Sequence, residues 1–424
     1  MAWLLPREDD EQTVLAGLDR KLENRVRLLI VSREYPPASE GGIARRLSCL
    51  VPRLLSKGID VDVVCFGGSS LHGERIWSLC PHSRILYTHS AQPSARDATS
   101  ILTDIWRLDR YASRILSSGR YDLVQVEDPV FGPFISSPVP KIVTVHTTQL
   151  GEFKALLGLL RNRRQIGRLL FSGTIGWAFD RISLNYADIV IAVGQTIRNE
   201  LLRSYRVPDR KVRVVPNGVD VPGELNKLEA KKSVGVDGNR LLLLYAGRLI
   251  DRKRVDDFIW ALHMLRQKGL ENFSGLVVGS GPSEAHLKGL ISKLGLSSHV
   301  KLTGYVNDDL LFHFLEAADV FVLPSCYEGH PISVMEAMAY GCLPIVADIP
   351  QMHEIVQPGR SGIIYPVGEL ESLTGAILEV ASDDEKRRSL SIAARESAKR
   401  MCWSTTASDY VSAYEDLVVS HHVR

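Results

Sequence analysis

The chain has 424 residues, enough for two or three domains of roughly 150 residues each. Hydrophobic residues make up 45% and charged residues 24%, values typical of a folded globular protein, which argues against a disordered chain. The formal net charge is only +2, so no overall positive field would attract nucleic acid, and we expect no nucleic-acid partner. The six cysteines include no Cys-x-x-Cys pair, which argues against a zinc ribbon.

The N-terminal residues are not typical of a signal peptide or a membrane anchor. Residues 1–24 are acidic and mixed, and no run of about 18 apolar residues occurs, so we expect a cytoplasmic protein. Residues 9–25 predict an amphipathic helix that serves as a packing extension. Residues 153–171 combine leucines with four arginines, as in a packed helix pair with outward arginines. The same composition is compatible with a basic acceptor cleft or with peripheral contact at the inner face of a membrane. The sequence indicates no oligomeric state.

The first half of the chain predicts a doubly wound α/β domain. Residues 26–32 (VRLLIVS) form a continuous apolar run, typical of a parallel strand covered by helices on both faces. A Pro-Pro and Gly-Gly loop, a helix over residues 43–57 and a strand over residues 61–66 then complete one βαβ unit. Further strands, separated by helical patterns, are predicted over residues 123–126, 141–146, 189–193 and 212–216.

The second half repeats this architecture after a polar, turn-rich junction at residues 217–223, where we expect a hinge. Strands are predicted over residues 240–247, 274–278, 300–303, 320–324 and 343–347, and helices over residues 255–267, 308–317 and 333–340. A last helix, over residues 404–419, is expected to cross back to the first domain. The predicted domains are an extension of residues 1–25, an N-terminal domain of residues 26–218 with 404–424, and a C-terminal domain of residues 219–403.

In open α/β sheets, ligands bind outside the carboxyl ends of the strands, so the loops that follow strands are the first candidates for a site. Glu40-Gly41-Gly42 precedes a helix, where N–H groups and the helix dipole favour a phosphate; the alternative is a tight turn with positive φ. Arg248 and Lys253 are two cations that either converge on a departing diphosphate or form a solvated basic turn. Gly279-Ser280-Gly281-Pro282 lacks the spacing and the acidic partner of a dinucleotide site, so we do not expect nicotinamide binding.

The strongest candidate loop lies between Pro324 and Gly341 and carries two glutamates. Glu328 follows a predicted strand, and Glu336 lies in the first turns of the next helix. Ser333 is predicted to be the N-cap of that helix, with Glu336 three residues later completing a capping box. A capping box explains Glu336 but leaves Glu328 unexplained, so the pattern favours a ligand that meets both carboxylates.

In this order, the motifs resemble those of the retaining glycosyltransferases of the GT-B fold, family 4. The matching segments are Pro36-Pro37 with Gly41-Gly42, Val215 to Asp220, Gly247-Arg248 with Lys253, Gly279 to Pro282, and Glu328 with Glu336-Ala337-Met338-Ala339. Each motif is modest alone, but five in order over nearly the whole chain are specific. The resemblance implies two Rossmann-like doubly wound domains that face each other across a cleft, with a C-terminal crossover helix.

The resemblance also implies roles for single residues. Glu328 would face the hydroxyls of the transferred sugar, and Glu336 would bind the ribose hydroxyls. Arg248 and Lys253 would clamp the diphosphate, and His146, which ends the strand over residues 141–145, would reach the donor sugar. These roles make His146, Arg248, Lys253 and Glu328 the candidate catalytic residues. The other implied donor-binding residues are Gly41, Gly42, Gly279, Gly329, His330, Pro331, Ile332 and Ser333, with Tyr305 and Val306 in the nucleobase pocket. Gly329-His330-Pro331 stands where the family commonly has Gly-Phe-Gly.

We expect neither a metal ion nor another cofactor. No aspartate pair with metal-site spacing ends a strand, and Asp60 and Asp62, at the start of one, are expected to be solvated. The predicted reaction moves a hexose-type sugar, with retained configuration, from a nucleotide diphosphate, foremost a UDP-sugar, to a hydroxyl of a sugar, lipid-linked or small-molecule acceptor. Two alternatives stay open: a nucleotide-sugar epimerase of the GT-B type, and a catalytically silent subunit that binds nucleotide sugars.

Overall fold

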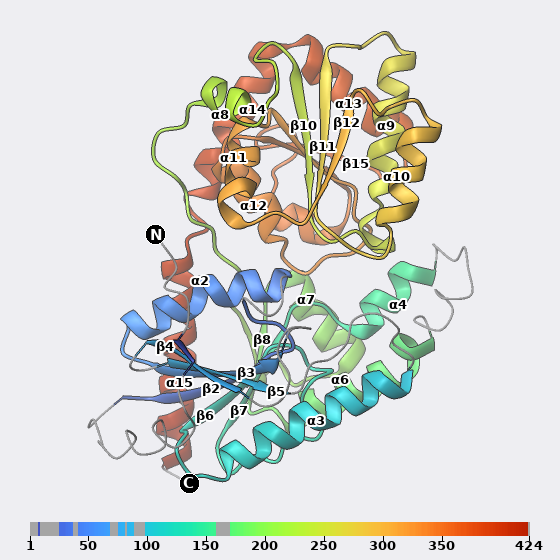
Figure 1. Ribbon diagram of the computed structural model, residues 1–424. Coiled ribbons are helices and arrows are strands. Elements are labelled where there is room, and N and C mark those ends of the chain that lie inside the picture. Colours follow the sequence, from blue (N-terminus) through green and yellow to red (C-terminus); the bar gives the residue numbers. More distant parts are fainter. Residues whose placement is uncertain are drawn as a thin grey trace. The chain divides into compact units, whose positions relative to one another are not determined.

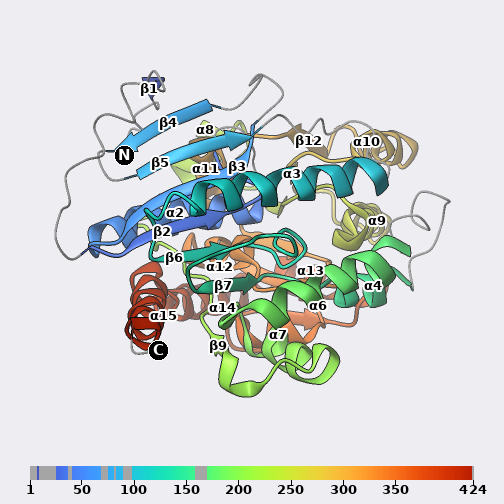
Figure 2. The same cartoon turned by 90° about the horizontal axis from the view of Figure 1, so that it is seen from below.

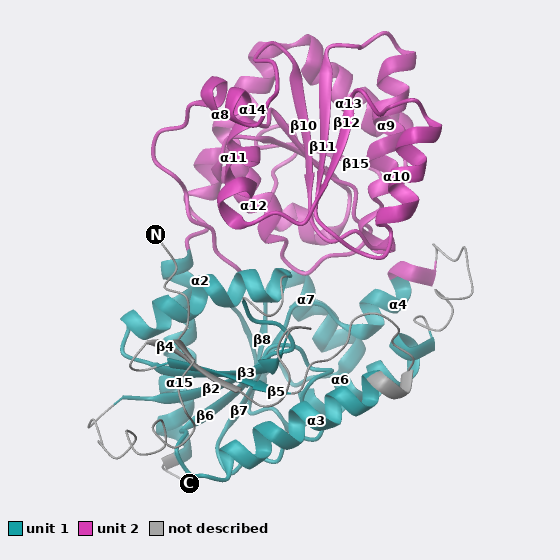
Figure 3. Ribbon diagram, in the orientation of Figure 1, with its two compact units in different colours: residues 1–154, 162–216, 403–424 teal, residues 155–161, 217–402 magenta. Residues whose placement is uncertain are grey.

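The structure is a computed structural model that describes residues 7–8, 25–36, 41–67, 75–80, 83–88, 98–157 and 170–422 (Figure 1). The helix predicted over residues 9–25 and the arginine-rich part of residues 153–171 lie outside these residues. The chain forms two compact units (Figure 3). Unit 1 contains residues 1–154, 162–216 and 403–424, and unit 2 contains residues 155–161 and 217–402.

Unit 1 is built on a sheet with the strand order β1-β4-β5-β3-β2-β6-β7-β8-β9 in the described part of the chain. The strands are β1 (Arg7–Glu8), β2 (Arg27–Val31), β3 (Asp60–Phe66), β4 (Arg75–Cys80), β5 (Ser83–Thr88), β6 (Leu123–Val126), β7 (Lys141–Val145), β8 (Ile189–Ala192) and β9 (Val212–Val214). From β5 to β9 all neighbours pair in parallel, whereas β4 pairs antiparallel with both β5 and β1. The antiparallel edge was not predicted from the sequence.

Helices cover both faces of this sheet, as its apolar strands require. Along β2, Leu28 and Ile30 enter one core and Leu29 and Val31 enter the other, so side chains on both faces are buried. The first core is closed by α2 (Gly42–Ser56) and α15 (Trp403–His422), and the second by α3 (Ala98–Leu116), α6 (Trp177–Tyr186) and α7 (Gln195–Glu200). Figure 2 shows this arrangement of helices about the strands of unit 1. The predicted doubly wound architecture is therefore confirmed.

The C-terminal helix α15 packs against α2 in unit 1, although the residues before it belong to unit 2. Its buried side chains Ala407, Tyr410, Tyr414 and Leu417 lie in the same core as Leu28 of β2. We predicted from the sequence that the last helix returns to the first unit, and its side chains are part of the hydrophobic core there.

Unit 2 has a parallel sheet of strand order β12-β11-β10-β13-β14-β15. These strands are β10 (Leu241–Ala246), β11 (Phe273–Val278), β12 (Val300–Gly304), β13 (Val320–Leu323), β14 (Leu343–Ala347) and β15 (Ile363–Tyr365). The helices are α8 (Lys227–Ser233), α9 (Val255–Gln267), α10 (Glu284–Lys293), α11 (Asp308–Ala317), α12 (Ile332–Ala339), α13 (Leu370–Ser382) and α14 (Asp384–Ala398). In Figure 1, α9 and α10 cover one face of the sheet, and α8, α11, α12 and α14 cover the other.

One expectation about unit 1 is wrong. Asp62 is not solvated: its carboxylate is buried, accepts a hydrogen bond from the Tyr121 hydroxyl at 2.7 Å, and pairs with the Arg84 guanidinium. Arg84 comes from β5, and Tyr121 lies two residues before β6, so the local sequence of β3 cannot reveal these partners. Among the described helices, none is long and apolar enough to cross a membrane.

Candidate functional site

The candidate residues of unit 2 come together because the strands that carry them are neighbours. Strands β11, β10 and β13 lie side by side in parallel, so the loops after them emerge at one edge of the sheet. These loops contain Gly279, the segment 247–253 and Glu328. The Cys326 amide donates to the carbonyl oxygen of Arg252 at 2.9 Å, which ties the second loop to the third.

A buried ion pair joins two of the predicted site residues directly. Lys253 Nζ lies 2.5 Å from Glu328 Oε1, and both side chains are almost fully buried. Arg252 adds a second cation, with Nη1 at 3.4 Å from Glu328 Oε2 and 2.6 Å from the carbonyl oxygen of Tyr327. From the sequence, we expected Glu328 and Lys253 to contact different parts of the donor. In the structure, they are each other's counter-ions.

The ion pair keeps the Glu328 carboxylate charged. Burial alone would raise the pKa of Glu328, but the charges of Lys253 and then Arg252 outweigh burial and lower it. A short 3-10 turn, Asp251–Lys253, and a left-handed Arg254 (φ 51°) carry the chain from this loop into α9. This turn buries Lys253, whereas Arg248, two residues after β10, is exposed.

Gly279 serves the close approach of two loops. Its φ is +131°, and a Cβ atom there would lie 2.0 Å from the carbonyl oxygen of Gly247. The Leu249 amide donates to the carbonyl oxygen of Ser280 at 2.9 Å, and the Gly279 amide donates to that of Gly304 at 2.9 Å. The Gly279 N–H is therefore used inside the protein. Because Gly279 has no side chain, the loop that carries Arg248 can pack closely against it.

The helix α12 begins one residue earlier than predicted, and the predicted capping box is wrong. Pro331 is the N-cap, and no described side chain caps the helix, so Ser333 is its second residue. A capping-box carboxylate needs an N-cap amide to accept from, and proline has none. Glu336 is nevertheless buried, one turn into the helix. The capping explanation for Glu336 is thereby removed, and its predicted role towards a ribose stays a prediction.

The loop between Glu328 and α12 is buried and held from a distant part of unit 2. Gly329, His330, Pro331 and Ile332 are all buried. The Asn217 side-chain amide donates to the carbonyl oxygen of His330 at 2.8 Å, across 113 positions of sequence. Burial lowers the pKa of His330 to about 4, so its imidazole is neutral at physiological pH. Asn217 is the first residue of unit 2 after its connection to unit 1, and sequence reasoning gave it no role in the site.

The predicted nucleobase contacts lie at the end of β12. Tyr305 is half exposed and Val306 is partly buried, after Gly304 with φ +73°. Their loop leads into α11, whose N-cap Asn307 accepts from the Leu310 amide. The exposed Tyr305 ring offers an apolar face, and base recognition by this residue stays a prediction.

Gly41, the N-cap of α2, accommodates a carboxylate of the chain itself. A Cβ atom on Gly41 would lie 2.1 Å from Glu34 Oε2, whereas one on Gly42 would meet nothing within 4 Å. Neither glycine has a positive φ, so the alternative of a tight left-handed turn is wrong. The Glu34 carboxylate thus already lies beside the N-cap of α2, where a phosphate was expected. Phosphate binding at Gly41 and Gly42 stays a prediction.

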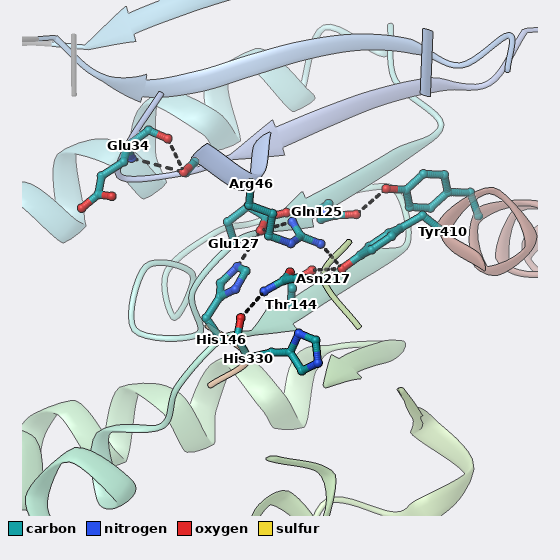
Figure 4. A network of polar contacts seen from close by, with 11 residues as sticks. Glu34, Arg46, Gln125, Glu127, Thr144, His146, Asn217, His330 and Tyr410 are labelled. Atoms are coloured by element: carbon teal, nitrogen blue, oxygen red, sulfur yellow. Dashed lines mark hydrogen bonds and ion pairs between the residues drawn. The ribbon is translucent and has the colours of Figure 1, made fainter. Parts of the chain in front are cut away.

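His146 follows β7, as predicted, but its ring is engaged by a glutamate that the sequence did not single out. Its Nε2 lies 2.8 Å from Glu127 Oε2, and Arg46 Nη1 lies 2.8 Å from the same oxygen (Figure 4). Glu127 and Arg46 are fully buried, whereas the His146 side chain is 15% exposed. The signal that could have found Glu127 is its position directly after β6, the neighbour of β7.

Within the described residues, no group of three or more His, Cys, Asp or Glu side chains is placed to hold a metal ion. The cations near Glu328 instead offer a place for an anion. Lys253, Arg252 and Arg248 all lie within the seven residues that follow β10, so the edge of this sheet carries positive charge.

Comparisons with known proteins agree with this architecture. The model of "Glycosyltransferase Family 4" matches residues 40–221, and that of "Glycosyl transferases group 1" matches residues 226–397. The chain is 25% identical to an uncharacterized glycosyltransferase of Methanocaldococcus jannaschii over 92% of this chain and 98% of that protein.

Two solved structures share the fold. Sucrose-phosphate synthase of Thermosynechococcus elongatus has a TM-score of 0.79 at 20% identity, over 93% of this chain and all of that one. HepE of Anabaena, solved in complex with UDP-glucose, has a TM-score of 0.71 at 18% identity over the same shares. The GT-B fold predicted from the sequence is confirmed. Because the two family models together account for both halves of the sequence, the chain belongs to the glycosyltransferases of family 4.

Proposed function

We propose that this glycosyltransferase moves a hexose-type sugar from a UDP-sugar to a hydroxyl of a sugar, lipid-linked or small-molecule acceptor, with retained configuration and without a metal ion. The observation that carries the proposal is the pair of Glu328 and Lys253 at the strand edge before α12. A nucleotide sugar presents hydroxyls and a diphosphate next to each other. A buried carboxylate can accept hydrogen bonds from the hydroxyls, and the buried ammonium beside it can bind the diphosphate.

The charges at this edge suit the departure of a diphosphate. As the bond between the sugar carbon and the phosphate oxygen breaks, negative charge grows on the leaving oxygen, and Lys253 and Arg248 stabilise it. The acceptor oxygen forms the new bond on the face that the phosphate leaves, and its proton passes to the leaving phosphate oxygen. No covalent sugar–enzyme intermediate is formed. Glu328 orients the sugar by accepting hydrogen bonds from its hydroxyls.

The uridine base is inferred by analogy with the HepE complex, whose fold this chain shares. An acceptor held by unit 1 would lie near His146, at the carboxyl end of β7. Peripheral contact with the inner face of a membrane is part of the proposal for a lipid-linked acceptor only.

Ligand-dependent unfolding tests the donor. A ligand that binds only the native state raises its stability, so we expect UDP to shift the thermal midpoint more than GDP, ADP or dTDP at equal concentration. A larger shift with another nucleotide would replace uridine by that base. NMR of the product tests the stereochemistry, and an inverted anomeric centre would contradict the mechanism. Incubation of the UDP-sugar alone must give no epimer.

A further inference from the structure

A network of buried polar side chains in unit 1 reaches from the C-terminal helix to His146 (Figure 4). At its centre, the guanidinium of Arg46 on α2 and the carboxylate of Glu127 after β6 form an ion pair of two fully buried side chains. A buried ion pair gives little net stability, because both charges must leave water. Its presence beside a proposed catalytic histidine therefore calls for another reason.

The network is anchored on α15. Tyr410 of this helix accepts a hydrogen bond from Arg46 Nη2, and its ring lies 5.0 Å from the Arg46 guanidinium carbon. Tyr414, one turn further, donates to Gln125 Oε1 at 2.6 Å, and Gln125 Nε2 donates to Glu127 Oε1. These contacts fix the carboxylate of Glu127 from both sides. Its position thus depends on α2, β6 and α15 together.

The contacts of Glu127 decide which nitrogen of His146 carries the proton. Burial alone would raise the pKa of Glu127, but the charge of Arg46 and the hydrogen bond from His146 lower it to about 2. An ionised carboxylate only accepts hydrogen bonds, so His146 Nε2, 2.8 Å away, must donate.

The ring of His146 is neutral as well. Burial lowers the pKa of His146, and the charges of Arg46 and Arg33 act in the same direction, against the effect of Glu127. A neutral imidazole with its proton on Nε2 has a lone pair on Nδ1. That nitrogen makes no hydrogen bond with the part of the chain that the structure describes, and the side chain keeps 15% of its surface exposed. A ligand can therefore reach the ring.

We propose that Glu127 is a positioning residue, which holds His146 in the Nε2-protonated tautomer so that Nδ1 accepts a hydrogen bond from a hydroxyl of the bound substrate. Arg46 and Tyr410 hold Glu127 in place for this purpose. The inference rests on the proposed function, because it needs a hydroxyl-bearing substrate at unit 1. The tautomer of His146 is a property of the protein alone, so this part of the inference does not depend on the proposed function.

The tautomer is measured without any substrate. In the full chain labelled with ¹⁵N-histidine, the His146 signals are assigned by their absence from the His146→Gln variant. We expect a neutral ring at pH 7, with a protonated Nε2 and an unprotonated Nδ1. A ring protonated on Nδ1, or on both nitrogens, overturns the proposal whether or not the chain transfers a sugar.

The coupling between the two residues is measured by a double-mutant cycle on sugar transfer. We expect Glu127→Gln to lower kcat roughly 100-fold while the donor KM changes little, because the ring is misplaced rather than removed. Since Glu127 acts only through His146, adding Glu127→Gln to His146→Gln must cause no further loss of kcat. Independent, multiplying losses would refute the positioning role.

Two further variants serve as controls for the experiment. Glu127→Gln leaves a buried Arg46 without its anion, which is strongly destabilising, so Arg46→Met/Glu127→Gln removes both charges and serves if the single variant does not fold. It must show the same loss of kcat. Asp256→Asn breaks a histidine–carboxylate pair of equal length, 2.8 Å to His286, on an exposed part of unit 2, and must leave kcat unchanged. If wild-type protein transfers no sugar while the tautomer is as expected, the proposed function fails and the positioning of the ring stands.

Discussion

Replacing Glu328 by glutamine breaks the ion pair with Lys253 at the candidate donor site. The substitution keeps the size and one acceptor of the side chain but removes its charge. Lys253 then becomes a buried cation whose closest anion, 2.5 Å away in the wild type, is gone. A bound diphosphate is the anion that we expect to replace it.

The size of the effect follows from burial. Removing one partner of a buried ion pair costs about 3–5 kcal/mol, because the other charge stays out of water. Glu328 and Lys253 are only 4% and 9% exposed, so little of this cost is relieved by solvent. For a domain of about 150–250 residues, each kcal/mol shifts the thermal midpoint by about 2–4 °C. We therefore expect Glu328→Gln to lower the midpoint of unit 2 by roughly 6–20 °C without ligand.

The assay is thermal unfolding with and without UDP, beside sugar transfer. UDP should stabilise Glu328→Gln more than it stabilises the wild type, since in the wild type Lys253 already has a counter-ion. Transfer should fall roughly 100-fold, because the sugar loses a charged acceptor. Nucleotide binding and transfer thus change in opposite directions.

A neighbouring ion pair supplies the control. Asp257→Asn breaks the pair of Asp257 with Arg254, 2.6 Å apart and also poorly exposed, on the segment just after Lys253. It should destabilise the protein without any extra stabilisation by UDP. If UDP stabilises Glu328→Gln no more than the wild type, or no more than Asp257→Asn, then Lys253 does not face the diphosphate, and the reasoning is refuted.

Three further predictions test the site and the fold. Arg248→Ala should lower turnover roughly 100-fold in a steady-state transfer assay, with stability unchanged because the side chain is exposed; an unaltered rate would remove Arg248 from the site. Gly279→Ala should cost about 2–5 kcal/mol in denaturant unfolding, because its Cβ would overlap the Gly247 carbonyl, whereas Gly289→Ala, in an open helical position, should gain about 0.5–1 kcal/mol. Asp109→Asn should stabilise the protein by up to about 4 kcal/mol at pH 8, because burial raises the pKa of Asp109 to about 7. The wild-type protein therefore loses stability as the pH rises from about 4 to 7, where the buried carboxyl must ionise. A stability gain of the variant that does not shrink towards pH 4 would contradict this.

Two of the strands that are buried on both faces were predicted with correct bounds. β6 and β14 match their predicted ranges exactly because a run of apolar residues ends where the chain reaches the sheet edge. β4 and β5 were not predicted. Arg84 interrupts the apolar pattern of β5, and its partner Asp62 lies on another strand, so the sequence of β5 alone does not explain the arginine.

The residues of the candidate donor site could be predicted from the sequence, but the ion pair that two of them form could not. Arg248, Lys253 and Glu328 stand out because each follows a strand, and parallel strands bring such loops to one edge. Lys253 reaches Glu328 because of the 3-10 turn Asp251–Lys253, and local sequence propensity does not predict such a short turn. Glu127 and Asn217 were missed for a related reason, since each acts on a residue far away in sequence.

The return of α15 to unit 1 makes unit 2 an insertion within the sequence of unit 1. During synthesis, residues 217–402 are complete before Tyr410 and Tyr414 leave the ribosome. Unit 2 can therefore fold as soon as it emerges, whereas unit 1 must wait for its last helix, although its first strand is made first. Until then, Arg46 and Glu127 lack the two tyrosines that complete their network. We therefore expect unit 2 to complete its fold before unit 1, and His146 to acquire its final surroundings last.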